Sequence, residues 1–285
     1  MEVTTTSEKL FFNTVKIATR SGDGTKSGTG TGFFYNHRVG DREIPFIVTN
    51  KHVVEGWHFG GFSFIPDAGG KPDLGKTLVH NLPNDQWSSM WVGHPDPQVD
   101  IAVCAFQPLL NEIVQKTGTG PFFAFSAQDQ IPTDEQIAQM DAFEELVFVG
   151  YPNGVWDQFN LLPVMRRGTA ASPLQVDFEG KPKFVIDASV FGGSSGSPVY
   201  LLDKGFHADR NGTIYASSRF FLLGVIAEVF TKTHHNEIIS IPIPTSHKPV
   251  AVHHEGIDLG VVFKSRTITE CCQQWVNTRL TKSPL

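Results

Sequence analysis

The sequence is poor in cysteine, has no long apolar run and carries no excess of positive charge. Its three cysteines are Cys104 and the adjacent pair Cys271 and Cys272, which is poorly placed to form a disulfide. Small secreted domains depend on disulfides, so we expect reduced thiols and a cytoplasmic protein. The first residues also lack the basic and apolar regions of a signal peptide. A mature chain from which a leader has been removed is the alternative.

Charge and hydropathy exclude several kinds of partner. The net charge of −6 at pH 7 provides no basic surface for nucleic acid or for an anionic membrane. No apolar stretch approaches the ~20 residues that a membrane span requires. We therefore expect no nucleic acid and no membrane among the partners.

No motif indicates a cofactor or a metal. The glycine-rich stretch 22–32 lacks the Gly-Lys-Ser/Thr of a phosphate-binding loop and continues into a strand pattern. The pairs His234-His235 and His253-His254 offer imidazoles to zinc, but adjacent side chains of a strand point to opposite faces. The sequence therefore predicts no cofactor and no metal.

Short β-branched and aromatic runs, punctuated by glycine, proline and asparagine, predict an all-β protein. A chain of 285 residues with 40% hydrophobic content can bury one large core or two packed halves. The expected strands are residues 12–19, 30–36, 44–50, 60–65, 99–106, 146–150, 161–170, 183–188, 197–202, 220–229, 238–241 and 259–263.

Two capping-box patterns predict helices. Thr133-x-x-Gln136 lies within the long connection 107–145 and begins a short helix. Thr267-x-x-Glu270 begins a C-terminal helix, which we expect to pack on the second half of the chain. The apolar face of that helix consists of Ile268, Cys272, Trp275, Val276 and Leu280.

The segment that carries most chemical information is Asp187-Ala-Ser-Val-Phe-Gly-Gly-Ser-Ser-Gly-Ser-Pro198. Glycines on both sides of a serine allow positive φ angles and a close approach of the backbone to a substrate. Acyl transfer needs such a hydroxyl beside N–H groups that stabilise a developing oxyanion. An ordinary Gly-Ser turn is the alternative for this segment taken alone.

Two residues upstream strengthen the acyl-transfer interpretation. His52 follows the β-branched and aromatic run that starts at Ile44, and Asp100 opens the apolar run that ends at Phe106. A serine hydroxyl needs a base to take its proton, and the base needs an acid that fixes its tautomer. The order His52, Asp100, Ser195 provides all three groups, each at the end of an expected strand.

These motifs resemble those of the trypsin-like serine peptidases, and most closely the bacterial Deg-type branch. The resemblance covers roughly residues 10–265, and its serine motif is the most specific part. It rests on Gly28-Thr-Gly-Thr-Gly-Phe-Phe34, Thr49-Asn-Lys-His52-Val-Val, Asp100-Ile-Ala-Val, Val147-Phe-Val-Gly-Tyr-Pro152, Gly193-Ser-Ser195-Gly-Ser-Pro198, Leu222-Leu-Gly-Val-Ile226 and Leu259-Gly-Val-Val262.

The resemblance implies both a fold and a set of roles. The implied fold has two six-stranded antiparallel β-barrels, residues 1–106 and 146–265, joined by a helical insert (107–145) and followed by a C-terminal helix (266–285). Ser195 would be the nucleophile, His52 the general base and then acid, and Asp100 the orienting acid. The N–H groups of Gly193 and Ser195 would form the oxyanion hole.

The sequence departs from the family's patterns in two features, one of which concerns activation and the other the domain content. Digestive members carry an aspartate before the nucleophile that pairs with a newly cut N-terminus, whereas this chain has Ser194. We therefore expect no activation by N-terminal insertion. Deg-type members usually continue into peptide-binding PDZ modules, and the sequence, which stops at Leu285, leaves no room for one.

By the same resemblance, the pocket for the residue before the cut is formed by Ser189, Val190, Ala227, Glu228 and Val229. The uncharged base of this pocket predicts a preference for an aliphatic or other uncharged side chain. Glu228 and Asp258 leave a basic preference open.

The sequence thus predicts a serine endopeptidase that cleaves protein substrates in limited intracellular proteolysis through an acyl-enzyme. An activating partner would explain how its activity is controlled. One alternative is a latent or inactive trypsin-like scaffold that binds proteins. The other is an α/β-hydrolase-type esterase, in which Ser194 would be the nucleophile of a Gly-x-Ser-x-Gly elbow between a strand and a helix.

Overall fold

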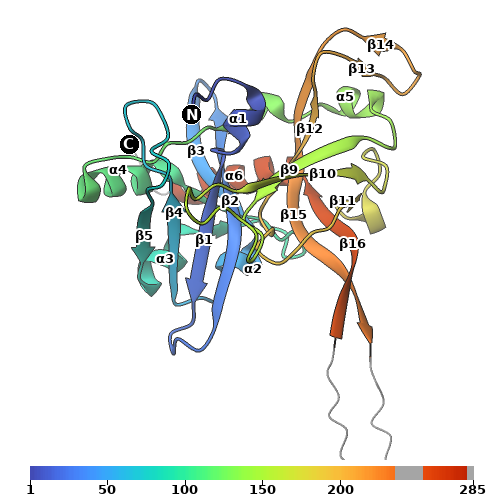
Figure 1. Ribbon diagram of the computed structural model, residues 1–285. Coiled ribbons are helices and arrows are strands. Elements are labelled where there is room, and N and C mark those ends of the chain that lie inside the picture. Colours follow the sequence, from blue (N-terminus) through green and yellow to red (C-terminus); the bar gives the residue numbers. More distant parts are fainter. Residues whose placement is uncertain (235–252, 281–285) are drawn as a thin grey trace, which may run out of the picture.

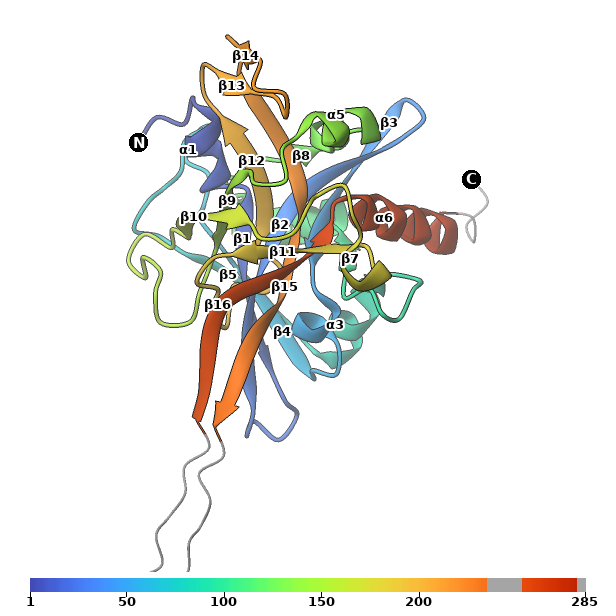
Figure 2. The same ribbon diagram turned by 90° about the vertical axis from the view of Figure 1, so that its right-hand side faces the viewer.

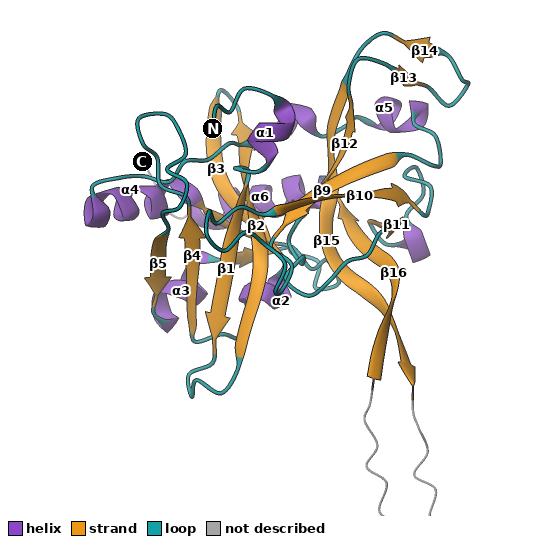
Figure 3. Cartoon of the chain, in the orientation of Figure 1, coloured by secondary structure: helices purple, strands orange, loops and turns teal. Residues whose placement is uncertain are grey.

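The two halves of the chain form two separate β structures that pack against each other (Figure 1). The computed structural model describes residues 1–234 and 253–280. Strands and loops make up most of the body, as the prediction of a mostly β protein requires, and the helices are short (Figure 3).

The N-terminal half is an eight-stranded sheet with the strand order β5-β4-β1-β2-β3-β7-β6, in which β8 pairs in parallel with β2. Its buried aromatic side chains include Phe34, Phe62 and Trp87. Its strands are β1 (Thr14–Arg20), β2 (Ser27–Val39), β3 (Arg42–Thr49), β4 (Phe59–Phe64), β5 (Leu78–Leu82), β6 (Val92–Gly93), β7 (Ala102–Ala105) and β8 (Ser126–Ala127).

This sheet differs from the predicted closed six-stranded barrel. Its two ends, β5 and β6, do not pair with each other among the residues that the structure describes. Helix α3 (Asn84–Met90) lies between them in the chain and fills this end of the sheet with the buried indole of Trp87. Strand β6 has only two residues.

The C-terminal half forms a closed barrel in the order β10-β11-β16-β15-β12-β9, as predicted. Phe148, Phe184 and Val199 belong to its core. Its strands are β9 (Glu145–Gly150), β10 (Val164–Ala170), β11 (Lys183–Asp187), β12 (Pro198–Asp203), β15 (Arg219–His234) and β16 (His253–Lys264). Beyond the barrel, β15 and β16 continue as a two-stranded ribbon that leaves the body of the molecule (Figure 2).

The remaining elements are helices, two 3₁₀ turns and a short hairpin. They are the helices α1 (Thr6–Leu10), α2 (Lys51–Val54), α4 (Phe106–Thr117), α5 (Asp134–Gln139) and α6 (Arg266–Arg279), the 3₁₀ turns Gln128–Gln130 and Phe178–Gly180, and the hairpin of β13 (His207–Ala208) and β14 (Ile214–Tyr215). The predicted capping box at Thr133 and Gln136 is confirmed at the start of α5. Helix α4 lies at the start of the insert that was expected to be helical, although Phe106, its first residue, was expected to end a strand.

The C-terminal helix is confirmed, but its cap is not at Thr267, and it packs on both halves of the chain. Helix α6 begins after Ser265, and the hydroxyl of Thr267 is buried and donates to the Lys264 carbonyl instead of capping the helix. The Sγ atom of Cys271 contacts the carbonyl oxygens of Val92 and Ile101. Helix α6 therefore packs on strands of the first half as well as on the second.

One core cluster joins the two halves. Phe33 and Val48 from the first half share it with Val149 and Leu222 from the second. A buried hydrogen-bond network also crosses this boundary, because the Tyr200 hydroxyl lies 2.6 Å from Asn13 Oδ1 and 2.7 Å from Ser126 Oγ. The contact between the halves is thus both apolar and specific.

All three cysteines are free and buried, as the reduced interpretation requires. None of the helices within residues 1–234 and 253–280 is long and apolar enough to cross a membrane.

Candidate active site

His52 and Asp100, which are far apart in the sequence, form a close pair. The Nδ1 atom of His52 lies 2.5 Å from Asp100 Oδ2, and the backbone N–H of His52 donates to Asp100 Oδ1 at 3.1 Å. An ionised carboxylate only accepts, so the proton of the neutral ring is on Nδ1 and Nε2 is left as the acceptor. The Asp100 backbone is itself fixed by the Asn50 side chain, which donates to its carbonyl oxygen at 2.7 Å.

The local sequence explains why the pair forms. Strand β3 ends at Thr49, and the single-turn helix α2 places His52 beside the end of this strand. Asp100 comes just before β7, which pairs antiparallel with β3 through Thr49 and Ala102. Adjacent strands therefore bring the two side chains together, as the positions at strand ends predicted.

The loop that carries Ser195 is attached to the first half through Thr31. The N–H of Thr31 donates to the Ser195 carbonyl at 2.9 Å, and its hydroxyl donates to the Gly193 carbonyl at 2.9 Å. The Thr31 carbonyl accepts from the Thr49 hydroxyl at 2.7 Å, close to His52 in the chain. Thr31 thus links the loop of Ser195 to the strand that leads to His52.

Residues 191–194 form a type II β-turn. The N–H of Ser194 donates to the Phe191 carbonyl at 3.0 Å, and Gly193 occupies the third position with a φ of +86°. This conformation favours glycine, and a Cβ atom at Gly193 would lie 2.5 Å from the Tyr151 carbonyl oxygen. Both the positive φ angle and the lack of space for a Cβ atom therefore require glycine at this position.

The orientation of the peptide between Gly192 and Gly193 is fixed from outside the turn. The backbone N–H of Asn153 donates to the Gly192 carbonyl at 2.7 Å, and the Asn153 side chain accepts from the Thr29 hydroxyl. Within the described part of the chain, neither the N–H of Gly193 nor that of Ser195 has an acceptor. Both donors are free for a ligand, which is the requirement for an oxyanion hole.

The structure distinguishes the two adjacent serines. Ser194 is only 2% exposed, whereas Ser195 is half-buried. The segment continues from Pro198 into strand β12, not into a helix, which contradicts the strand-to-helix elbow that Ser194 needs as an esterase nucleophile. The Ser195 hydroxyl has no hydrogen bond to His52 or to any other described residue.

The comparison with protein-family models decides the family. The model for the trypsin-like peptidase domain matches residues 30–206, a span that includes His52, Asp100 and Ser195. The chain belongs to the trypsin-like peptidases. It is a serine protease of that family, and proteins are therefore its substrates.

Solved structures of serine proteases resemble this peptidase at low sequence identity. The thermostable protease AL20 from an extremophilic microorganism is 15% identical, with 94% of this chain and 98% of that chain covered and a TM-score of 0.47. The serine endoprotease from Yersinia pestis is 16% identical, with 97% and 68% covered and a TM-score of 0.46. A search of curated protein sequences gave no match.

The predicted substrate-pocket residues of this peptidase lie in different environments. Val190 is half-buried and packs on the core of the second barrel, and Ser189 beside it is also half-buried. Ala227 is buried in the core cluster that joins the halves. Glu228 and Val229 are exposed on β15, beyond a bulge in its pairing with β16.

Sequence reasoning missed three residues around this site. Thr31 and Asn153 hold the loop, and Arg166 on β10 lies with its guanidinium carbon 5.0 Å from the centre of the Phe191 ring. The glycine-threonine stretch signalled the neighbourhood of Thr31. Nothing in the local sequence signalled the other two, because their contacts depend on strand register.

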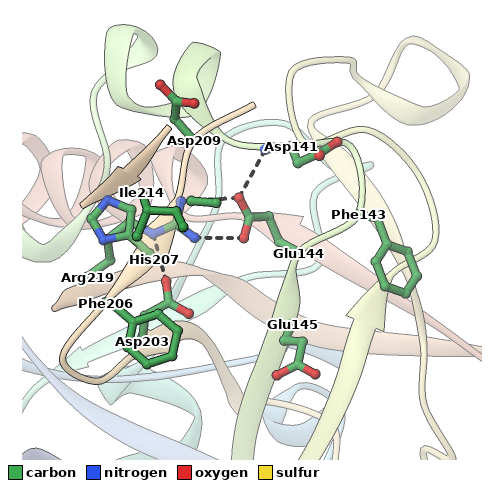
Figure 4. Close-up of a pocket in the computed structure, with 11 residues that line it drawn as sticks. Asp141, Phe143, Glu144, Glu145, Asp203, Phe206, His207, Asp209, Ile214 and Arg219 are labelled. Carbon is green, nitrogen blue, oxygen red and sulfur yellow. Dashed lines mark hydrogen bonds and ion pairs between the residues drawn. The ribbon is translucent and has the colours of Figure 1, made fainter. Parts of the chain in front are cut away.

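A hollow that is separate from the candidate active site lies between residues 141–145, the ends of β12 and β15, and the β13–β14 hairpin (Figure 4). Its centre is an ion-pair network in which Arg219 donates to Glu144 at 2.9 Å and to Asp203 at 2.6 Å. No serine, threonine or cysteine is among its lining residues. We therefore assign this network to stability and not to peptide hydrolysis.

The histidine pairs of the sequence raised the question of a metal site. Residues 1–234 and 253–280 contain no group of three or more histidine, cysteine, aspartate or glutamate side chains that could hold an ion. His235, one of the histidines considered as a zinc ligand, lies outside the described residues.

Proposed function

We propose that this serine protease is an endopeptidase that uses Ser195, His52 and Asp100 as a catalytic triad. The observation that carries the proposal is the His52–Asp100 pair at 2.5 Å, together with a serine loop whose two N–H groups are free. The closed second half corresponds to one barrel of the family fold, the open sheet of the first half takes the place of the other, and the site would form where the halves meet.

Each residue has a role in the proposed reaction. The Ser195 hydroxyl attacks the carbonyl carbon of the scissile bond, and His52 Nε2 takes its proton. The Gly193 and Ser195 N–H groups stabilise the oxyanion, and the protonated His52 then gives its proton to the leaving amine. Water enters, loses a proton to His52 and hydrolyses the acyl-enzyme. Asp100 keeps the imidazole oriented and stabilises its charged form.

We also propose that the enzyme acts in limited intracellular proteolysis, under the control of an activating partner. Three free, buried cysteines support a reducing compartment.

Labelling with a fluorophosphonate probe tests the triad. The wild type and Ser194→Ala should react at Ser195, whereas Ser195→Ala and His52→Ala should not. Ser194→Ala is the matched control, because it removes the adjacent hydroxyl and leaves the turn intact. Labelling that depends on Ser194 would contradict the assignment. No labelling of a folded wild-type protein would favour the alternative, an inactive scaffold that binds proteins.

A further inference from the structure

Arg166 is a charged residue on the inner face of the closed barrel. It lies directly opposite Phe148 in the antiparallel pairing of β10 with β9. Opposite residues of an antiparallel pair share a face of the sheet, and Phe148 belongs to the barrel core. Ala170, which is on the same face of β10, belongs to that core as well. The Arg166 side chain is therefore directed to the barrel side of the sheet.

The guanidinium lies beneath the loop that carries Ser195. Its central carbon is 5.6 Å from the centre of the Phe148 ring and 5.0 Å from that of Phe191. Phe191 starts the turn that holds the proposed oxyanion hole, and it directly follows Val190, one of the residues expected to line the pocket for the residue before the cut. The guanidinium therefore lies against the faces of two aromatic rings, beside the loop that is expected to form one wall of the substrate pocket.

Arg166 has no polar partner to balance its charge. Its Nη1 atom is buried without a hydrogen bond, and no described carboxylate forms an ion pair with it. The neighbouring residue, Arg167, points outward and pairs with Glu145. Arg166 is half-buried, and a buried donor without an acceptor is unfavourable, so a ligand that accepts a hydrogen bond from Nη1 and neutralises the charge would be stabilised here. The planar guanidinium matches a carboxylate in particular, because it can donate two parallel hydrogen bonds.

We propose that Arg166 determines specificity by binding the side-chain carboxylate of an acidic residue immediately before the scissile bond. The inference rests on the proposed function of Ser195. It replaces the sequence-based expectation of an uncharged residue at that position, which considered only the loop walls and not the strand beneath them.

Peptide substrates that differ only at the residue before the cut test this proposal. The wild type should cleave after glutamate or aspartate at least about tenfold faster, in kcat/KM, than after glutamine or leucine. Arg166→Gln should lose that preference, and Arg166→Lys should retain part of it. Arg167→Gln is the matched control and should keep the full preference. Equal or faster cleavage after glutamine and leucine by the wild type would overturn the proposal.

Two further measurements separate this inference from the proposed function. Fluorophosphonate should label Ser195 in Arg166→Gln as in the wild type, which also shows that the variant folds. Loss of labelling in the wild type itself would overturn the proposed function. A Ser195→Ala protein should bind a peptide that ends in glutamate more tightly than one that ends in glutamine. Equal affinity for the two peptides would overturn the role of Arg166 without any reference to catalysis.

Discussion

The backbone N–H of Asn153 donates a 2.7 Å hydrogen bond to the carbonyl oxygen of Gly192. This bond turns the Gly192 carbonyl toward residues 151–154 and so leaves the N–H of Gly193 on the opposite side of the same planar peptide. In self-activating relatives, an aspartate before the nucleophile orders this turn. Here Ser194 occupies that position, and the contact with Asn153 orders the turn instead.

Gly193→Ala should abolish most of the activity while the protein remains folded. A side chain at a φ of +86° costs about 1–2 kcal/mol, and its Cβ atom would meet the Tyr151 carbonyl oxygen. The turn would then rearrange and lose an oxyanion donor, which lowers kcat by about 100-fold or more. Gly212→Ala is the control, because Gly212 has a φ of +79° and open space around it. Wild-type kcat in Gly193→Ala would contradict the assigned oxyanion hole.

Thr31→Val should weaken both stability and activity. The substitution keeps the shape of the side chain but removes the hydroxyl that donates to Gly193 and accepts from Tyr151. Each buried group left without a partner costs about 1–3 kcal/mol. Urea unfolding and kcat/KM should both report the loss, and Thr31→Ser should restore them. Thr19→Val is the control, since the buried Thr19 hydroxyl has no partner among the described residues and its loss should cost little.

Asp100→Asn should lower kcat by about 10⁴-fold with little change in KM. An amide that donates to His52 Nδ1 stabilises the wrong tautomer of the ring and leaves Nε2 protonated, so the ring cannot accept the proton of Ser195. Single-turnover kinetics on a peptide ester would measure the effect on acylation directly. Asp96→Asn is a nearby control that leaves the pair intact. A loss of less than tenfold in Asp100→Asn would show that the imidazole does not depend on this carboxylate.

The buried thiols should be unreactive at neutral pH and should destabilise the fold at alkaline pH. Burial raises the pKa of Cys271 to about 12, and it also raises the pKa values of Cys104 and Cys272. As pH rises above about 9, the unfolded chain loses thiol protons that the folded chain retains. The free energy of unfolding should therefore decrease as the pH rises above 9. Below pH 9 these thiols should not affect it.

Alkylation and urea unfolding measure these two effects. Iodoacetamide at pH 8 should modify no cysteine of the folded enzyme and all three in urea. The urea midpoint should be lower at pH 10 than at pH 8. Rapid alkylation of the folded protein at Cys104 would contradict its burial.

Arg219→Met should reduce stability strongly, by about 3 kcal/mol. The Arg219 guanidinium pairs with the buried Glu144 and with the partly buried Asp203, and both carboxylates would be left without it. Arg167→Met provides a matched control, because Arg167 and Glu145 form an exposed pair that contributes at most about 1 kcal/mol. Chemical denaturation should separate the two variants, and equal midpoints would show that burial of the Arg219 network has no effect.

Local patterns in the sequence predicted the parts of the site that lie at strand ends. His52 and Asp100 each adjoin an apolar run, and the antiparallel pairing of β3 and β7 brings them together. The choice of Ser195 over Ser194 rested on family resemblance, and the burial of Ser194 agrees with it. Strand patterns predicted the all-β character of the second half, and the family resemblance implied its closed barrel.

Other features depend on contacts that no local pattern encodes. Thr29 and Thr31 stand in the same glycine-rich stretch, and only the docking of the two halves decides which hydroxyl meets Gly193. Arg166 and Arg167 are equivalent in the sequence, and the register of β10 alone directs one inward. The cap predicted at Thr267 was wrong for the same reason. Packing buries the Thr267 hydroxyl inside the first turn of α6, where it does not cap the helix.

Strand β16 closes the second barrel, and this closure has a consequence for the synthesis of the enzyme. The loop of Ser195 is held at one end by β16, where Ala188 N–H donates to the Asp258 carbonyl, and at the other by β15, where Gly196 N–H donates to Ile226. Because a ribosome makes the chain from its N-terminus, residues 253–264 emerge long after the serine itself. A nascent chain therefore carries the three side chains of the proposed triad before the strand that holds the Ser195 loop has been made.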